Sequence, residues 1–253
     1  MKATLARIHR FPIKSVGGEQ LEHVTLSAGQ ILPGDRAFAV AHADSARHLE
    51  PDGTLAKWLP KSAFLRGAAS ADLQAITGGW RDGRLCLSHP GRPDLVTEPE
   101  SDDGAALMAW LDALWPGDRA RPLRLVRAPV PLTDVREPWV SLLSLSSLSA
   151  LEKALGRGLG TGRWRGNLWV EGWAPWAERD MAGTRLRIGE AELVVRTRIT
   201  RCAATNADTT TGRADCDMPA ELRALLGDAD FGVYAEITAG GQIATGDRIE
   251  ILS

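Results

Sequence analysis

Residues 192–212 read ELVVRTRITRCAATNADTTTG, and this stretch decides both the fold and the chemistry that we expect. Its first part, Glu192–Thr200, is rich in β-branched side chains and predicts a strand. A polar loop follows and ends in a turn at Gly212. Cys202 therefore stands at a strand exit, between an apolar scaffold and solvent.

The position of Cys202 leaves two interpretations open. The guanidinium groups of Arg198 and Arg201 favour a thiolate at this position, and thiolates are soft metal ligands. Alternatively, Cys202 is a small buried hydrophobe, which is the usual state of a free cysteine. The second interpretation suits Cys86 and Cys216 better, because neither combines cationic neighbours with a polar loop.

The rest of the second half predicts a β-barrel or closed sheet. Short strands separated by glycine-rich turns are expected at Asn167–Glu171, Thr184–Ile188, Phe231–Thr238 and Asp247–Leu252. Two helices are expected, one over Ser146–Leu155 with Ser146 or Ser147 as its cap, the other over Met218–Leu226. The fold class is therefore α+β and mainly β.

The first half also predicts β structure, and a domain junction follows it. Strands are expected at Lys2–Ile8, Leu21–Leu26 and Arg36–Ala41, and a helix at Asp102–Leu114, whereas Leu55–Leu65 has no clear pattern. Three prolines between Arg127 and Pro138 mark the junction. We therefore expect a β-rich domain over residues 1–126 and a β-barrel domain over residues 127–253.

Composition describes an ordinary globular protein: 253 residues, 44% hydrophobic and 25% charged, with a formal net charge of -2. That charge supplies no general field for a nucleic acid, so an anion site must be local. Three cysteines without CxxC spacing suggest neither disulfides nor zinc. No apolar run suits a signal peptide or a membrane span, so we expect a cytoplasmic protein.

Two further clusters carry positive charge at strand–turn junctions. Arg163-Trp164-Arg165-Gly166-Asn167 precedes an apolar strand, and arginine forks suit phosphates and planar heterocycles. Lys14-Ser15 and, some twenty residues on, Gly34-Asp35-Arg36 would suit a phosphate. Each cluster taken alone is more typical of a solvated surface than of a binding site. Walker, GxSxG and HExxH motifs are missing.

Taken in order, these clusters resemble the MOSC family, named for the C-terminal domain of molybdenum cofactor sulfurases, in its form with an N-terminal β-barrel domain. The resemblance covers nearly the whole chain and is greatest to bacterial relatives of the mitochondrial amidoxime-reducing component. It rests on PIKS (12–15), GDR (34–36), RWRGN (163–167), RCAATNADTTTG (201–212), FGVY (231–234) and GDRIEIL (246–252). The cysteine loop is the most specific of these motifs.

The resemblance implies a pterin-based molybdenum cofactor, Mo-molybdopterin, with Cys202 as the metal ligand. By matching motifs, the residues that would hold the cofactor are Lys14, Ser15, Arg36, Arg165, Asn167, Thr200, Arg201 and Tyr234. The chain departs from the family at Gly166, where proline is common, and at Asn206–Thr209, where relatives carry a valine-aspartate-proline run. These departures put substrate preference in doubt more than fold or cofactor.

The activity that the resemblance implies is the reduction of small N-hydroxylated compounds of the amidoxime type. Asp208 is a candidate proton donor, or a turn-forming aspartate. The sequence ends at Ser253, directly after GDRIEIL, so we expect electrons from a separate ferredoxin-like, cytochrome b5-like or flavin reductase protein. The main alternative is a cofactor carrier or sulfur-transfer module without small-molecule turnover, and the third is a structural β protein with a buried cysteine.

Overall fold

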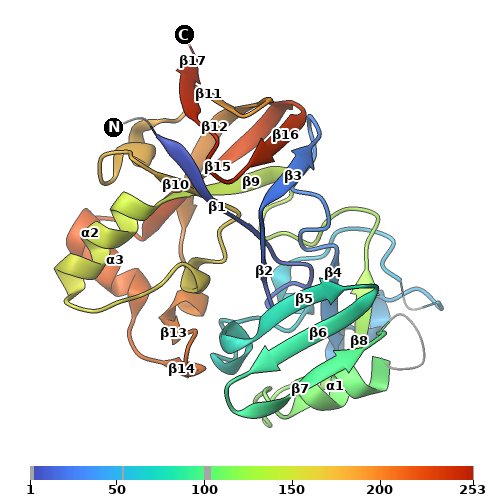
Figure 1. Ribbon diagram of the computed structural model, residues 1–253. Helices are drawn as coiled ribbons and strands as arrows, with labels where there is room; N and C mark the ends of the chain where they lie inside the picture. Colours follow the sequence, from blue (N-terminus) through green and yellow to red (C-terminus); the bar gives the residue numbers. More distant parts are fainter. Residues whose placement is uncertain (1–2, 53, 100–103, 253) are drawn as a thin grey trace.

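The computed structural model describes residues 3–52, 54–99 and 104–252. Its centre is an eight-stranded sheet built from six strands of the second half of the chain and two from its beginning (Figure 1). In spatial order, its strands are β17 (Ile249–Leu252), β11 (Arg185–Ile188), β12 (Ala191–Thr200), β15 (Asp230–Ala239), β9 (Trp139–Ser144), β10 (Leu168–Glu171), β1 (Thr4–Arg10) and β2 (Glu19–Leu21). Neighbours pair antiparallel except β9 and β10, which run parallel.

The sheet curls back on itself to form a barrel-like closure. Thr4 of β1 forms a bridge with Arg248, and the Leu5 backbone N–H donates to the Asp247 carbonyl at 2.8 Å. A short pair, β3 (His23–Leu26) and β16 (Gly241–Ala244), adds to this part of the molecule. The enclosed core is aliphatic, with Leu5, Leu142 and Leu193 fully buried, and burial of such side chains is the main stabilising term.

Two helices pack together beside the barrel (Figure 1): α2 (Leu145–Leu155) and α3 (Met218–Leu226). The second matches its predicted bounds. The first begins earlier than its predicted cap, because Ser144, rather than Ser146 or Ser147, accepts from the Ser147 backbone N–H at 3.3 Å. Both end at a left-handed glycine, which satisfies the last helical carbonyls.

The first half forms a second core of its own. Its strands are β4 (Phe38–His42), which pairs with β8 (Pro122–Arg127), and a sheet of β5 (Thr77–Arg81), β6 (Arg84–His89) and β7 (Arg92–Thr97). Helix α1 (Gly104–Asp112) contributes Leu107, Trp110 and Leu111 to this core. Figure 1 shows this unit below the barrel.

Short elements complete the chain and several of them border the site described below. The 3-10 helices are η1 (Ala43–His48), η2 (Lys61–Ala63), η3 (Asp72–Ala75), η4 (Gly162–Trp164), η5 (Ala177–Asp180) and η6 (Ala203–Asn206). The hairpin of β13 (Ala207–Asp208) and β14 (Arg213–Ala214) follows η6. No helix in the described part of the chain is long and apolar enough to cross a membrane.

The predicted α+β, mainly β architecture is confirmed. Predicted strand Leu21–Leu26 is broken at Glu22 into β2 and β3, and the predicted first strand begins at Lys2, which lies outside the described residues. The start of the helix predicted from Asp102 lies outside them too. The domain boundary near residue 127 stays a prediction, and it falls at the end of β8. Three strands that precede this boundary belong with the barrel: β1 pairs with β10 and β2, and β3 pairs with β16.

Candidate functional site

A cavity of about 370 Å³ is lined by all of the residues that were predicted from the sequence to bind a cofactor. They are Lys14, Ser15, Arg36, Arg165, Asn167, Thr200, Arg201, Cys202 and Tyr234. They come from both halves of the chain and from the three clusters that looked like separate surface patches in the sequence. The fold therefore gathers them into one site.

Cys202 lines this cavity where β12 ends. Its backbone carbonyl accepts from the Thr205 backbone N–H at 2.9 Å and from the Thr205 hydroxyl at 2.8 Å, which shapes the turn into η6. Arg163, 2% exposed, anchors the same loop: it donates to the Thr205 carbonyl at 2.9 Å and makes a two-pronged ion pair with Asp215 at 2.8 Å. The loop that carries the thiol is thus fixed from two sides.

Arg201 lies next to Cys202 and holds the two walls of the cavity together. Its guanidinium donates to the Phe231 carbonyl at 2.8 Å through Nε and to the Trp164 carbonyl at 3.0 Å. Burial lowers the pKa of Arg201 to about 10, although the nearby Tyr234 and Cys202 oppose that shift. The side chain stays charged at neutral pH and contributes a fixed positive charge beside the thiol.

The second predicted arginine of this neighbourhood, Arg198, has a different role. Its guanidinium donates to the Arg179 carbonyl at 2.8 Å and pairs with Asp180 at 3.1 Å and Asp228 at 3.3 Å. These two carboxylates already balance its charge. Of the two arginines expected to favour a thiolate, only Arg201 is free of an acidic partner within ion-pair distance among the described residues.

Arg165 and Arg36 join the two halves of the chain at the cavity wall. Arg165 donates to the Gly17 carbonyl at 2.7 Å and to the Ile13 carbonyl at 3.2 Å, and its own carbonyl accepts from Arg36 at 2.8 Å. Both guanidinium groups lie over the Phe11 ring, 4.3 Å and 4.6 Å from its centroid. Burial, and then the charge of Arg36, lowers the pKa of Arg165 to about 9.

The backbone is strained at three site residues. Ser15, Arg36 and Arg165 have φ of 60°, 46° and 47°, in the left-handed region that residues with side chains rarely adopt. Such conformations persist only where the surrounding structure enforces them, and they gather at functional sites. Arg36 is held by a hydrogen bond to the Asp35 carboxylate, and Asp35 also accepts from the Phe11 backbone N–H at 2.8 Å.

Lys14 is almost fully buried, 4% exposed, yet lines the cavity. Its ammonium donates to the Leu132 carbonyl at 3.0 Å and to Asp134 Oδ1 at 2.5 Å. Burial lowers the pKa of Lys14, and the Asp134 charge opposes that effect. Burial on its own would raise the pKa of Asp134, but the charge of Lys14 and the hydrogen bond from it outweigh burial and set that pKa at about 2.

The remaining predicted residues differ in how far their polar groups are used in hydrogen bonds within the fold. Asn167, 3% exposed, is engaged in the fold: its Oδ1 accepts from the Ser141 hydroxyl at 2.8 Å, and its Nδ2 donates to the His9 carbonyl at 3.3 Å. The Thr200 hydroxyl donates to Asp230 Oδ1 at 2.6 Å. Burial raises the pKa of Tyr234, so its phenol stays protonated at neutral pH.

Asp208 is the one predicted site residue that does not line the cavity. Its carboxylate accepts from the Thr210 backbone N–H at 2.8 Å and from the Thr211 hydroxyl at 3.2 Å. The hydrogen bond from Thr210 is the largest cause of its lowered pKa. This is the geometry of a turn-forming aspartate, the second of the two roles that the sequence left open.

Positive charge dominates the cavity wall. Seven lining residues are cationic (Lys14, Arg36, Lys61, Arg163, Arg165, Arg198 and Arg201), whereas only Asp35 and Asp134 are acidic. The chain as a whole carries a formal charge of -2. Four of the seven cations are balanced by carboxylates: Lys14 by Asp134, Arg36 by Asp35, Arg163 by Asp215, and Arg198 by Asp180 and Asp228. Lys61, Arg165 and Arg201 have no ion-pair partner among the described residues, and these three supply the local positive field for an anion.

Several residues that line the cavity were not predicted from the sequence, notably Lys61, Gln74 and Asp134. Lys61 belongs to the stretch without a clear pattern, and Asp134 to the stretch interpreted only as a domain junction. No local motif marks them, because tertiary packing alone brings them to this cavity. The one feature of the sequence that singles out Asp134 is its acidic side chain within the proline-rich connection between the two halves of the chain.

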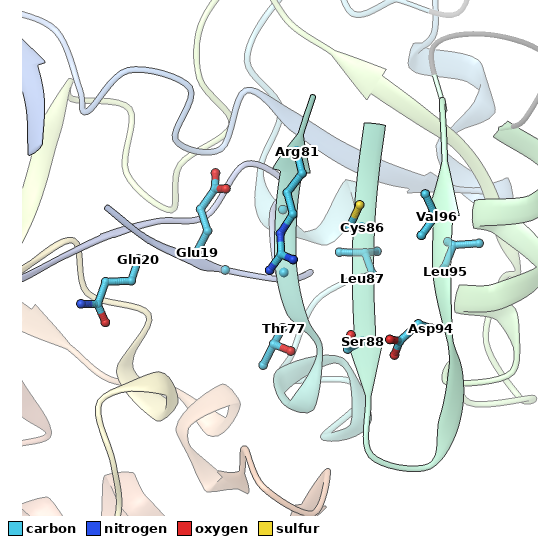
Figure 2. A pocket seen from close by; sticks show the side chains of 13 residues that line it. Glu19, Gln20, Thr77, Arg81, Cys86, Leu87, Ser88, Asp94, Leu95 and Val96 are labelled. Atoms are coloured by element: carbon cyan, nitrogen blue, oxygen red, sulfur yellow. The ribbon is translucent and has the colours of Figure 1, made fainter. Parts of the chain in front are cut away.

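A second, larger cavity of about 520 Å³ lies elsewhere, on the face of the sheet β5–β6–β7 (Figure 2). Glu19, Arg81, Cys86 and Asp94 line it, and none of the predicted site residues does. Among the described residues, no group of three or more His, Cys, Asp or Glu side chains gathers in a way that would hold a metal ion.

Comparison with known proteins identifies both parts of the chain. Residues 132–250 match the family model described as MOSC domain, and residues 2–113 match the one described as MOSC N-terminal beta barrel domain. No curated protein matches.

Among solved structures, the YuaD protein of Bacillus subtilis is 13% identical with a TM-score of 0.47, over 99% of this chain and 96% of that one. YiiM from Geobacillus stearothermophilus is 18% identical with a TM-score of 0.37, over 45% and 54% of the two chains. YiiM from Escherichia coli is 17% identical with a TM-score of 0.34, over 45% and 54%. The two family models together span most of the chain, from residue 2 to residue 250, and the chain belongs to the MOSC family.

Proposed function

We propose that this protein binds a molybdenum cofactor through Cys202 and reduces N-hydroxylated compounds in the cytoplasm. One observation carries the proposal: a thiol, Cys202, opens on a cavity whose wall is lined by seven cationic side chains in a chain of net charge -2. A soft anionic ligand beside many fixed donors is what a metal bound to a phosphorylated, planar organic group requires. MOSC domains are linked in general to binding of this cofactor.

The residues present fit such a group. Lys14 and Arg36 would hold its phosphate from the first half of the chain, where burial excludes water and strengthens charge–charge attraction. Arg165 and Arg201 would hold it from the barrel side, with their guanidinium planes fixed by backbone carbonyls. Trp164 stacks on Phe231 with centroids 4.0 Å apart and supplies an apolar wall.

When bound, the cofactor would supply the redox chemistry that removes the oxygen of an N–OH group. The chain's own contribution is to position and polarise. Tyr234 stays protonated and can donate a hydrogen bond into the cavity, whereas Asp134 stays ionised at neutral pH and cannot supply a proton there. Asp208 lies outside the cavity and has no part in the proposal. Electrons would come from a separate carrier protein.

The test is turnover of benzamidoxime by protein produced in a cofactor-competent host, with a reduced viologen as artificial electron donor. We expect amidine formation by the wild type and none by Cys202→Ser. Cys86→Ser is the matched control, because Cys86 lines the other cavity. Wild type that contains molybdenum and pterin but forms no amidine would contradict the reductase proposal and support a cofactor carrier instead.

A further inference from the structure

We propose that Asp134 is a positioning residue, which keeps the Lys14 ammonium charged and aimed into the cavity so that Lys14 can hold an anionic phosphate. The inference rests on the proposed function for the identity of the anion. Asp134 lies in the connection between β8 and β9, far from Lys14 in sequence. Neither the resemblance nor the motifs gave it a role.

The geometry of Lys14 is the first support. An ammonium has three N–H donors and no acceptor. Two of them are used on one short segment, at the Leu132 carbonyl (3.0 Å) and at Asp134 Oδ1 (2.5 Å). Among the described residues nothing accepts the third, and Lys14 lines the cavity. Fixing two donors of a tetrahedral group also fixes the direction of the third.

The charges that face Lys14 are the second support. Lys14 is 4% exposed, so removal of water disfavours its charged form. The other groups that act on it are Arg36 and Lys61, which are cations and disfavour its charge as well. Asp134 is the only group of opposite sign among those acting on Lys14. The Lys14 charge therefore depends on this one carboxylate.

Asp134 can take this role without blocking the site. Its side chain lines the cavity and is 56% accessible, whereas the Lys14 side chain that it contacts is 5% accessible. Only Oδ1 contacts Lys14, and no described residue donates to Oδ2. One carboxylate oxygen thus fixes the ammonium from the side, and the third N–H of Lys14 remains for a ligand.

The test isolates the charge of Asp134 with the nearly isosteric change Asp134→Asn. The chain has five lysines, so the 13Cε resonance of Lys14 can be assigned with a Lys14→Met variant and titrated in protein free of cofactor. We expect the Lys14 titration to fall by ~1–3 pH units in Asp134→Asn and to return in Asp134→Glu. An unmoved titration would overturn the proposal.

Asp180→Asn is the matched control. Asp180 also pairs with a lining residue, Arg198, at 3.1 Å, but an arginine keeps its charge when it loses an acidic partner. We expect no change in the Lys14 titration. Dispersed amide spectra for all variants establish that each is folded before its titration is compared.

The second readout is pterin retained after dialysis of cofactor-loaded protein between pH 6 and pH 9. Because the Lys14 charge is lost as pH rises, Asp134→Asn should begin to lose pterin at a lower pH than wild type and Asp180→Asn do. Tighter retention by Asp134→Asn at every pH would instead make Asp134 a competitor of the phosphate and contradict the proposal. Wild type without any pterin refutes the proposed function, and the Lys14 titration still decides this inference.

Discussion

The guanidinium of Arg165 donates to the backbone carbonyl of Gly17 at 2.7 Å and so links two positions 148 residues apart. The same side chain also reaches Ile13 at 3.2 Å. Gly17 has φ of 64°, and a Cβ there would lie 2.5 Å from the Gly78 carbonyl oxygen, so the loop at this point accepts no side chain. Arg165 therefore fixes the loop that carries Lys14 and Ser15 against the barrel.

Replacement of Arg165 by lysine should lower both stability and cofactor retention. A lysine ammonium lacks the planar fork and cannot serve both carbonyls in the same geometry. We expect the free energy of unfolding to fall by about 1.5–3 kcal/mol, the usual contribution of a hydrogen bond to a charged group. Urea unfolding of the two proteins measures this difference in the free energy of unfolding. Arg81→Lys, at an exposed position for which no ion pair is found among the described residues, should change the free energy of unfolding by less than about 0.5 kcal/mol.

Gly166 departs from the family pattern, and the structure shows why a side chain is costly there. A Cβ at this position would lie 2.2 Å from Leu143 Cδ1, and Arg165 immediately before it is already strained. Gly166→Ala should cost about 1–3 kcal/mol by overpacking, measured by denaturant unfolding. Gly158→Ala has nothing within 4 Å of the added Cβ and is the control. Equal stability of the two variants would refute this account of Gly166.

His9 should make the protein less stable in mild acid. Burial, and then the charge of Arg7, lowers the pKa of His9 from 6.5 to about 4. The unfolded chain therefore takes up this proton below pH 6.5 while the folded chain does not, so stability is present above pH 6.5 and is lost as pH falls toward 4.

His9→Gln should remove about 2 kcal/mol of that loss, measured as the unfolding free energy at pH 7 and pH 4.5. The exposed His23 provides the control variant His23→Gln, which should keep the wild-type pH dependence. A pH profile of His9→Gln that overlays the wild type would contradict the assignment.

The sequence predicted the barrel strands well where apolar side chains alternate or run together between glycine turns, as in β12 and β15. It did not predict β9, because Trp139–Ser144 passes directly into α2 without a glycine or proline between strand and helix. The sheet β5–β6–β7 was missed although Asp82-Gly83, both with positive φ, forms the tight turn of its first hairpin. That dipeptide is a strong hairpin signal that was not used.

The candidate site was predictable as far as its motifs extend. Lys14, Arg165 and Cys202 stand in local patterns with recognisable chemistry, and the fold brings them to one cavity. Asp134 and Lys61 were not predictable, because their relation to Lys14 arises from packing between distant segments. Asp208 shows the opposite case: its position in the cysteine loop suggested chemistry, but its hydrogen bonds to Thr210 and Thr211 are those of a turn.

The central claim, that Cys202 ligates the metal of a pterin cofactor, is tested most directly by elemental analysis together with the fluorescence of oxidised pterin. Wild type, Cys202→Ser and Cys86→Ser are produced in parallel in a cofactor-competent host. We predict molybdenum and pterin together in wild type and Cys86→Ser, and loss of molybdenum from Cys202→Ser. Molybdenum at wild-type stoichiometry in Cys202→Ser would contradict the ligand assignment.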